Sequence, residues 1–272
     1  MYKIIASDLD ETLLDDTHHI PKRVRTAIAA AHDAGAKFVP ATGRGFTTVR
    51  DALEELGLAG QPDEYVISFN GGVVVENAGD RILSKQGVTW DFANRIWTYG
   101  RELGDVCVHI YTMDTVWVLN YNDAERAYVG SRMNMVESFE PTLDFLRGED
   151  IIKCLYMSLD VPYLRRIATD LADLTRDIDV SYSSNRYLEF NARGVNKGSG
   201  LLGLAKALGV RPEETMAIGD NYNDLSMVEA AGMGVFVANA PQELHERADY
   251  VCEADNNAGG VAEAIERFVL SA

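Results

Sequence analysis

Short apolar runs alternate with segments of helical character near both ends of the chain, and this alternation limits the possible folds more than any other feature. In the first part, the apolar runs 2–7, 36–41 and 64–69 are separated by 21–35 and 46–57, which we interpret as helices. The runs are continuously apolar, as is typical of parallel strands covered on both faces. A β-α-β-α-β order then predicts a right-handed, doubly wound α/β sheet.

The middle of the chain, from about residue 84, has a different pattern of hairpins and long helices. Its hairpin strands are expected at 106–112 with 115–121 and at 178–184 with 186–192, and its long helices at 90–104 and 161–175. Hairpins imply an antiparallel sheet with helices on one face. The strand–helix alternation returns after Arg193. We therefore predict a doubly wound, mostly parallel Rossmann-like core of residues 1–84 and 191–272, with an α+β domain of residues 85–190 inserted into it.

Composition excludes several classes of partner. The 272 residues include 42 acidic and 25 basic side chains, a formal net charge of −17, which disfavours general binding to nucleic acid. No apolar run reaches the roughly 18 residues of a membrane span, and the N-terminus enters a strand directly, so neither a membrane partner nor a signal peptide is expected. The widely separated Cys107, Cys154 and Cys252 are expected to be buried, reduced thiols of a cytoplasmic protein. The sequence carries no signal for the oligomeric state.

Two carboxylates directly follow the first predicted strand. Asp8 and Asp10 are separated only by Leu9, where the chain leaves the interior. Carboxylates repel each other and are costly to remove from water, so a positive group is expected beside them.

Three other polar segments are expected nearby, because ligands of α/β proteins bind beyond the carboxyl ends of the strands. They are Thr42-Gly43-Arg44 after the second strand, Asp220 to Asp224 after the strand 215–220, and Lys197 at the start of a helix. Clustered carboxyl oxygens are suitable ligands for Mg²⁺. Lys197, Thr42 and backbone N–H groups could receive the oxygens of a phosphoryl group. The sequence therefore predicts phosphoryl-transfer chemistry.

The spacing of Asp8 and Asp10 permits two different roles. On an extended chain, residues two apart point the same way and lie about 6–7 Å from each other. Asp8 adjoins the rigid strand and is the better nucleophile. Asp10 is the better general acid and base, which protonates the leaving alkoxide and then activates water. Thr12 could hydrogen-bond to Asp10 or to its backbone and hold it in place.

These segments resemble the motifs of the haloacid-dehalogenase-like superfamily of phosphotransferases. The matching stretches, in the order of that family, are "DLDET", "ATGR", the lysine of "GVNKGSGLLGLAKALG" and "GDNYNDLSMVEAAG". The insertion between the second and third motifs resembles the cap domain of the Cof-type phosphatases, as do "NGG" after the third strand and the closing "NNAGGVAEAI". The resemblance covers essentially the whole chain. It implies a cap at 85–190 that closes over the site and selects the substrate.

The resemblance also implies a role for each matching residue. The catalytic residues would be Asp8 as nucleophile, Asp10 as general acid and base, Thr42 and Lys197. The metal site would include Asp8, the backbone carbonyl of Asp10, Asp220 and Asp224, with Asn221 in a supporting position. The substrate-binding residues would be Thr12, Gly43, Asn223 and, near the mouth of the site, Arg44. Glu11 stands where the subgroup usually has glycine. The glutamate adds negative charge near the metal site, and its Cβ atom restricts the backbone conformations that glycine could adopt there.

Each segment also has a simpler interpretation when it is taken alone. Asp8 and Asp10 could form a solvated turn, and Thr42 to Arg44 an ordinary connection between a strand and a helix. Lys197 would be a surface lysine, although a cation at a helix N-terminus is mildly unfavourable. Asp220 to Asp224 could be a helix cap. His109 of the cap is expected to be packed or hydrogen-bonded instead of acting as a ligand.

The sequence thus predicts a Mg²⁺-dependent phosphatase that hydrolyses a small phosphorylated metabolite, such as a sugar phosphate, through an aspartyl-phosphate. A phosphomutase of the same architecture is the first alternative and would need a basic cluster in the cap. The cap arginines, whose placement mostly suggests solvent-exposed faces, are Arg95, Arg101, Arg126, Arg132, Arg165 and Arg166. A non-catalytic binding or regulatory protein is the second alternative, and the intact Asp10 argues against it.

Overall fold

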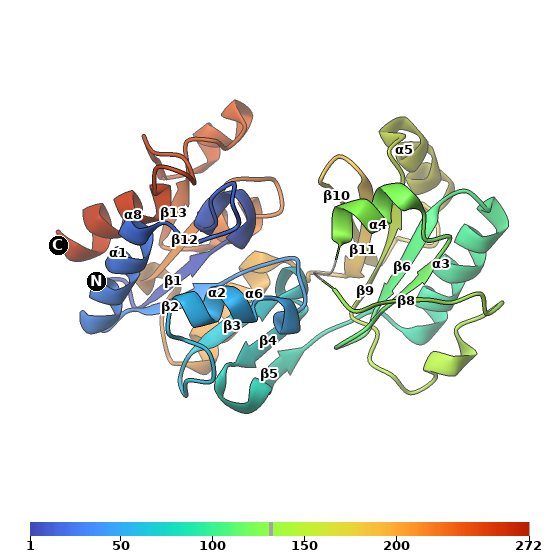
Figure 1. The fold of residues 1–272 in the computed structure, drawn as a ribbon, viewed down its shortest axis with the longest axis horizontal. Helices are drawn as coiled ribbons and strands as arrows, with labels where there is room; N and C mark the ends of the chain where they lie inside the picture. Colours follow the sequence, from blue (N-terminus) through green and yellow to red (C-terminus); the bar gives the residue numbers. More distant parts are fainter. Residues whose placement is uncertain (131–132, 272) are drawn as a thin grey trace. The chain divides into compact units, whose positions relative to one another are not determined.

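The computed structural model describes residues 1–130 and 133–271, and its chain divides into two compact units (Figure 1). Met1–Ser84 and Asn196–Ala272 form the first, here called the core unit, and Lys85–Val195 form the second, the inserted unit. The division after Val195 lies later than the expected boundary at 190/191. Strand β11 (Tyr187–Ala192) pairs with two strands of the inserted unit and keeps its residues there.

A parallel sheet forms the centre of the core unit, with the strand order β14-β13-β12-β1-β2. Its strands are β1 (Ile4–Ser7), β2 (Lys37–Pro40), β12 (Thr215–Gly219), β13 (Met233–Phe236) and β14 (Tyr250–Val251). All residues of β1 and β12 are buried, which agrees with their continuously apolar sequences. The expected parallel α/β sheet is confirmed.

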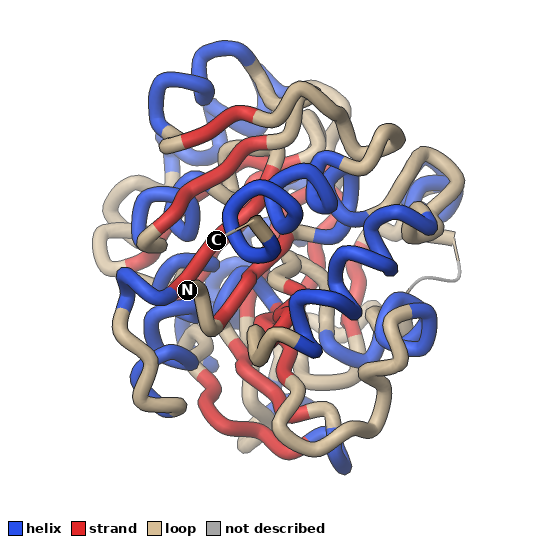
Figure 2. Tube along the Cα trace, turned by 90° about the vertical axis from the view of Figure 1, so that its left-hand side faces the viewer, coloured by secondary structure: helices blue, strands red, loops and turns tan. Residues whose placement is uncertain are grey.

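Helices cover both faces of this sheet, as the doubly wound fold requires. They are α1 (Lys22–Asp33), α2 (Arg50–Glu55), α6 (Lys197–Ala207), α7 (Leu225–Ala230) and α8 (Gly260–Ile265). Ile5 of β1 shares one apolar cluster with α1 and α8, whereas Ile4 and Ala6 share another with α6 and α7. The N-terminus and the last described turn, Glu266–Leu270, lie near each other in this unit, in both views (Figures 1 and 2).

The third expected strand lies outside the main parallel sheet, in which the sequence had placed it. β3 (Tyr65–Ser68) forms a separate sheet with β4 (Val73–Glu76) and β5 (Arg81–Lys85), in which β3 and β4 are antiparallel. It joins β2 through an isolated parallel bridge between Ala41 and Ile67. The sequence pattern did not predict β4 and β5. The Asn-Gly-Gly sequence that follows β3 reverses the chain, because both Asn70 and Gly71 have positive φ angles.

Short irregular helices complete the core unit. Those of 3₁₀ type are Phe46–Thr48, Phe69–Gly71, Ala78–Asp80, Pro212–Glu214 and Gln242–Arg247, and wider turns of π type span Leu9–Leu13 and Glu266–Leu270. The segment expected as one helix at 46–57 is thus a 3₁₀ turn followed by α2.

The inserted unit is built on a mostly antiparallel sheet, with the strand order β10-β11-β9-β6-β7-β8. Its further strands are β6 (Cys107–Tyr111), β7 (Val116–Leu119), β8 (Met135–Glu137), β9 (Lys153–Met157) and β10 (Ile178–Ser183). Both expected hairpins, β6 with β7 and β10 with β11, are confirmed. The second turns through Ser184 and Asn185, both with positive φ angles, as a two-residue hairpin turn requires.

Two long helices cover one face of this sheet, as expected. α3 (Trp90–Leu103) and α5 (Val161–Asp170) contribute Trp97 and Ile167 to an apolar cluster with Ile110 and Phe190. The sequence pattern did not predict α4 (Asp123–Val129), the 3₁₀ turn Asp144–Leu146 or β8, which is parallel to β7. α4 lies against the other face, because Glu125 contacts His109, whose neighbours Val108 and Ile110 face the apolar cluster.

All three cysteines are buried and free, as expected. Among the described residues, no helix is both long and apolar enough to cross a membrane.

Glycine at position 198 is required by the packing of α6 against α7. A Cβ atom added to Gly198 would lie 2.2 Å from the carbonyl oxygen of Ser226, whereas one added to the exposed Gly203 of the same helix would have open space. We predict that Gly198→Ala lowers the free energy of unfolding by about 1–3 kcal/mol through overpacking. Gly203→Ala should raise it by about 0.5–1 kcal/mol, because alanine is the better helix former. Urea denaturation of both variants tests this, and equal effects would contradict it.

Candidate active site

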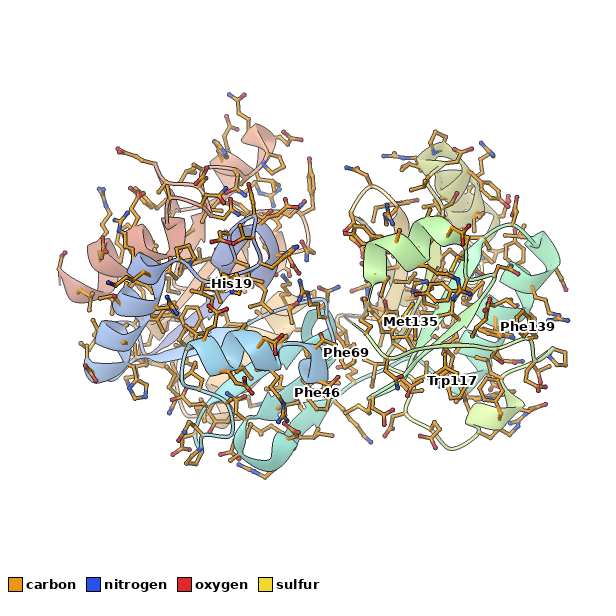
Figure 3. All side chains as sticks on the ribbon, in the orientation of Figure 1. His19, Phe46, Phe69, Trp117, Met135 and Phe139 are labelled. Atoms are coloured by element: carbon orange, nitrogen blue, oxygen red, sulfur yellow. The ribbon has the colours of Figure 1, made fainter. Side chains whose placement is uncertain are left out.

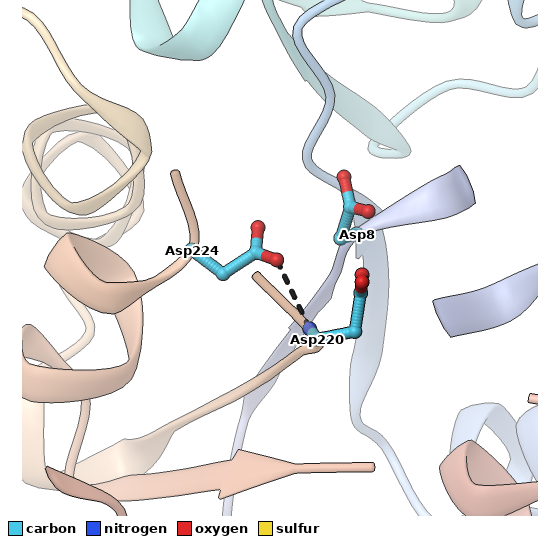
Figure 4. A group of neighbouring side chains, drawn as sticks. All are labelled: Asp8, Asp220 and Asp224. Atoms are coloured by element: carbon cyan, nitrogen blue, oxygen red, sulfur yellow. Dashed lines mark hydrogen bonds between the residues drawn. The ribbon is translucent and has the colours of Figure 1, made fainter. Parts of the chain in front are cut away.

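The strand register brings two acidic residues together at one edge of the parallel sheet. Ser7, the last residue of β1, is paired with Ile218 of β12, so Asp8 and Asp220 follow neighbouring strands (Figure 4). The backbone N–H of Asp8 donates to the carbonyl of Ile218 at 3.0 Å. This edge is the carboxyl end of the strands, where the sequence predicted a site.

A third carboxylate completes a compact acidic cluster. Asp8, Asp220 and Asp224 each offer one carboxylate oxygen, and these oxygens lie within 4.8 Å of one another. The three residues are only 6%, 3% and 0% exposed. Such a cluster repels itself strongly unless cations are present.

Lys197 supplies the one positive charge that the described residues place within this cluster. Its side chain is fully buried, and its Nζ donates to Oδ1 of Asp8 and, at 2.6 Å, to Oδ1 of Asp224. Burial alone would lower the pKa of Lys197, but the charges of Asp224 and Asp8 outweigh it and raise the pKa. The ammonium group is therefore permanently charged. The interpretation of Lys197 as a surface residue is wrong.

Asp224 is held by more hydrogen bonds than the other two acids. Its Oδ2 accepts from the backbone N–H groups of Asp220 and Asn221, both at 3.0 Å, and its Oδ1 accepts from Lys197 (Figure 4). Gly219 makes room for it, because a Cβ atom there would lie 2.4 Å from the Cβ of Asp224. Since both oxygens are engaged, Asp224 fixes the loop and the lysine, and Asp8 and Asp220 remain the better placed cation ligands.

Asp220 is positioned by Thr12. The Thr12 hydroxyl, which is buried, donates to Oδ1 of Asp220 at 2.7 Å. Thr12 was expected to hydrogen-bond to Asp10 or to its backbone, and the observed partner is different. Burial raises the pKa of Asp220 to about 7, with a further contribution from the charge of Asp224 and an opposing one from the Thr12 hydrogen bond.

Asp10 lies in a different environment from Asp8. Its side chain is 44% exposed and receives both arms of the Arg44 guanidinium, Nε at 2.8 Å from Oδ2 and Nη2 on Oδ1. Arg44 therefore contacts Asp10 directly, where the sequence analysis expected it beside the substrate near the mouth of the site. Burial, in contrast, raises the pKa of Asp8 well above its usual value, against the lowering effect of Lys197.

The loop that follows β2 is fixed by the segment after β3. The Thr42 hydroxyl accepts from the N–H of Arg44 at 3.1 Å, and its carbonyl accepts from Asn70 N–H at 2.9 Å. Phe69, labelled in Figure 3, donates its N–H to the carbonyl of Arg44, and its ring leaves no room for a side chain at position 45. This anchoring role was not predicted from the sequence, although the "NGG" stretch marked the segment.

Gly43 and Asn223 complete the set of predicted site residues. A Cβ atom on Gly43 would lie 3.1 Å from Oδ1 of Asn70, so the small residue permits the close approach of the two loops. Asn223 is partly buried in the turn that leads into α7, and the neighbouring Asn221 is exposed.

Comparison with known proteins identifies the family. Residues 5–265 match the haloacid dehalogenase-like hydrolase family. The chain is 30% identical to 5-amino-6-(5-phospho-D-ribitylamino)uracil phosphatase YcsE of Bacillus subtilis, covering 98% of this chain and 96% of that protein. It is also 30% identical to a phosphoglycolate phosphatase of Methanothermobacter thermautotrophicus, covering 98% and 99%. The chain belongs to the haloacid dehalogenase-like hydrolase family. It is a phosphatase, a hydrolase of phosphoric monoester bonds.

The fold of this phosphatase agrees with the assignment. A haloacid dehalogenase-like hydrolase from Bacteroides thetaiotaomicron has the same fold with a TM-score of 0.85 and 29% identity, over 98% of this chain and 99% of that one. The likeness includes both units and confirms the resemblance that the sequence motifs indicated.

The inserted unit of the phosphatase contains buried polar groups that the sequence analysis did not single out. Lys153 donates to Glu189 at 2.7 Å, with both side chains nearly buried, and Arg186 pairs with the fully buried Glu125 at 3.2 Å. His109 is fully buried, with Nε2 3.3 Å from the Cys107 sulfur, and burial lowers its pKa to about 3. The ring is packed, as expected, and the low pKa keeps it neutral.

The arginines singled out in the inserted unit face solvent, as expected. The exposed ones are Arg95, Arg101, Arg126, Arg165 and Arg166. Arg132 lies outside the described residues. The described members of this set therefore form no buried basic cluster.

The acidic cluster makes the stability of the metal-free phosphatase dependent on pH. The pKa of Asp220 is about 7 in the folded chain, above the ordinary value of 3.8. Between pH 3.8 and pH 7 the folded state therefore binds more protons than the unfolded state. We predict that the free energy of unfolding falls as pH rises from about 4 through about 7, and that Asp220 contributes up to about 4 kcal/mol of this fall. Thermal unfolding in the presence of a chelator measures it.

Two controls make this prediction specific to the cluster. Asp220→Asn should remove much of the fall, and millimolar Mg²⁺ should stabilise the wild type more at pH 8 than at pH 5. A pH dependence that is unchanged in Asp220→Asn would show that other groups cause it.

Proposed function

We propose that this phosphatase hydrolyses a small phosphorylated metabolite with the help of Mg²⁺, through an aspartyl-phosphate on Asp8. The observation that carries the proposal is the contrast between its two neighbouring carboxylates. Asp8 is buried against Lys197 and the other acids, whereas Asp10 is half-exposed and held by Arg44. One is suited to attack and the other to proton transfer.

The donors around Asp8 fit a hard divalent cation. Three buried carboxylates face one ammonium group, so a negative charge remains uncompensated. Mg²⁺ binds oxygen ligands and prefers one or two carboxylates together with water and substrate oxygens. Asp8, Asp220 and the backbone carbonyl of Asp10 would hold it. A bound Mg²⁺ would neutralise negative charge on the phosphoryl oxygens.

In the first half of the reaction, a carboxylate oxygen of Asp8 attacks phosphorus in line with the bond to the leaving oxygen. The bond between phosphorus and the leaving oxygen breaks as the new bond to Asp8 forms. Asp10 donates its proton to the leaving alkoxide, which departs as an alcohol. Lys197 and the Thr42 hydroxyl stabilise the negative charge of the phosphoryl oxygens during the transfer.

In the second half, water attacks the phosphorus of the aspartyl-phosphate. Asp10, now a carboxylate, accepts a proton from this water, and the bond between phosphorus and Asp8 breaks. Inorganic phosphate leaves, and both carboxylates return to their starting protonation states. The Arg44 fork holds the Asp10 carboxylate in one orientation for this second step, because two parallel hydrogen bonds fix its plane.

Two features support a small metabolite, such as a sugar phosphate, as the substrate. The relatives at 30% identity are named for a phosphorylated ribitylamino compound and for phosphoglycolate, which are both small phosphate monoesters. The net charge of −17 disfavours phosphorylated nucleic acid.

A phosphate-release screen over a panel of phosphorylated metabolites and an aryl phosphate, with Mg²⁺, tests the proposal. Asp8→Asn should abolish turnover because the nucleophile is lost. Asp10→Asn should lower kcat by about 10²–10⁴-fold because the acid and base are lost. Asp33→Asn changes an exposed acid at the end of α1 and should leave turnover unchanged.

Three outcomes would contradict the proposal. Retained turnover in Asp8→Asn would exclude this nucleophile. An isomerised sugar phosphate without free phosphate would indicate a phosphomutase. The absence of turnover of any panel compound by the wild type would favour a binding protein.

A further inference from the structure

Glu11 has a backbone conformation that is unfavourable for its side chain. Its φ and ψ angles are 59° and 10°, in the left-handed region, and they break the regular turn of Leu9–Leu13. A residue with a Cβ atom is less stable there than in the right-handed region, whereas glycine is tolerated. Something in the structure must hold this conformation.

Glu11 lies between two residues of the acidic site. The preceding Asp10 binds Arg44, and the following Thr12 binds Asp220. If Glu11 adopted a right-handed conformation, the chain direction would change between them and both contacts could not persist. The left-handed conformation of Glu11 therefore allows Asp10 to bind Arg44 while Thr12 binds Asp220.

The side chain of Asn239 contacts this strained residue. Asn239 follows β13 and is 228 residues away in sequence, and its Nδ2 donates to the backbone carbonyl of Glu11 at 2.7 Å. Its Oδ1 accepts from the N–H of Asn256 at 3.1 Å. Both ends of the amide are thus engaged, so its orientation is fixed.

Asn256 and Asn257 bind the same loop farther along. The buried Asn256 donates to the carbonyl of Leu14 at 3.0 Å, and the carbonyl oxygen of the Asn257 side chain accepts from the N–H of Asp16 at 3.0 Å. Of these three amides, the one that contacts Glu11 is Asn239. None of the three amides was assigned a role from the sequence.

We propose that Asn239 is a positioning residue of the cation site, which holds Glu11 in the left-handed conformation that glycine would adopt unaided. The hydrogen bond to the Glu11 carbonyl fixes ψ of Glu11 and, through it, the relative placement of Asp10 and Thr12. The inference rests on the proposed Mg²⁺ site. It concerns only how this chain maintains the geometry of that site with a glutamate at position 11.

Asn239→Ala provides the direct test, with Asn257→Ala as the matched control. Asn257→Ala removes the hydrogen bond from the Asp16 N–H and one to the Asn256 side chain, and it does not touch Glu11. Isothermal titration of the phosphate-free protein with Mg²⁺ measures binding, and aryl phosphate hydrolysis measures kcat/KM. We expect Asn239→Ala to weaken Mg²⁺ binding by about tenfold, within the range for residues that orient metal ligands. Asn257→Ala should change it by less than about twofold.

Rescue by glycine separates this role from general loosening of the loop. In the Glu11→Gly background, Asn239→Ala should change Mg²⁺ affinity by less than about twofold, because glycine keeps the left-handed conformation without help. Glu11→Gln removes the same charge but keeps the strain, so Asn239→Ala should still cost about tenfold in that background. Thermal unfolding checks that each variant is folded.

The outcomes distinguish this inference from the proposed function. If the wild type neither binds Mg²⁺ nor hydrolyses the aryl phosphate, the proposed function fails. If the wild type does both, two results would overturn the role of Asn239. One is an unchanged Mg²⁺ affinity in Asn239→Ala, and the other is an equal loss in the Glu11→Gly background.

Discussion

The buried ammonium group of Lys197 is the interaction on which the rest of the site depends. It joins Asp8, at the end of β1, to Asp224, at the start of α7, and it has no exposed surface. Removing one partner of such a buried ion pair leaves an unpaired charge and typically costs about 3–5 kcal/mol. Because Asp8 and Lys197 are 189 positions apart in sequence, the site forms only when the two segments of the core unit fold together.

The single positive charge of Lys197 does not neutralise three carboxylates, so the site retains a negative charge that a cation can compensate. The uncompensated charge raises the pKa values of Asp8 and Asp220, with burial as the larger cause. A cation that compensates this charge would make the acidic cluster more stable and would attract anionic substrate oxygens. The same arrangement leaves Asp10 outside the cluster, half-exposed and paired with Arg44. The proposed mechanism rests on placing two acids, two residues apart, in different electrostatic surroundings.

The sequence predicted the parallel sheet and the acidic site because both depend on strong local signals. Continuously apolar runs such as 215–219 identify buried strands, and the carboxyl ends of parallel strands must share an edge. Two features that the sequence did not predict depend on loop conformation. β3 turns back to pair with β4, and Arg44 reaches across to Asp10. The partner of Thr12 also depends on the left-handed angle at Glu11, and no local pattern predicted that angle.

A crystal structure with Mn²⁺ in place of Mg²⁺, together with a phosphate analogue, tests the central claim most directly. Anomalous scattering would locate the metal without ambiguity. The account predicts one strong peak in contact with carboxylate oxygens of both Asp8 and Asp220, at about 2.0–2.3 Å, with Lys197 still bound to Asp8. A crystal of active enzyme whose metal lies elsewhere, or touches neither of these residues, would contradict it.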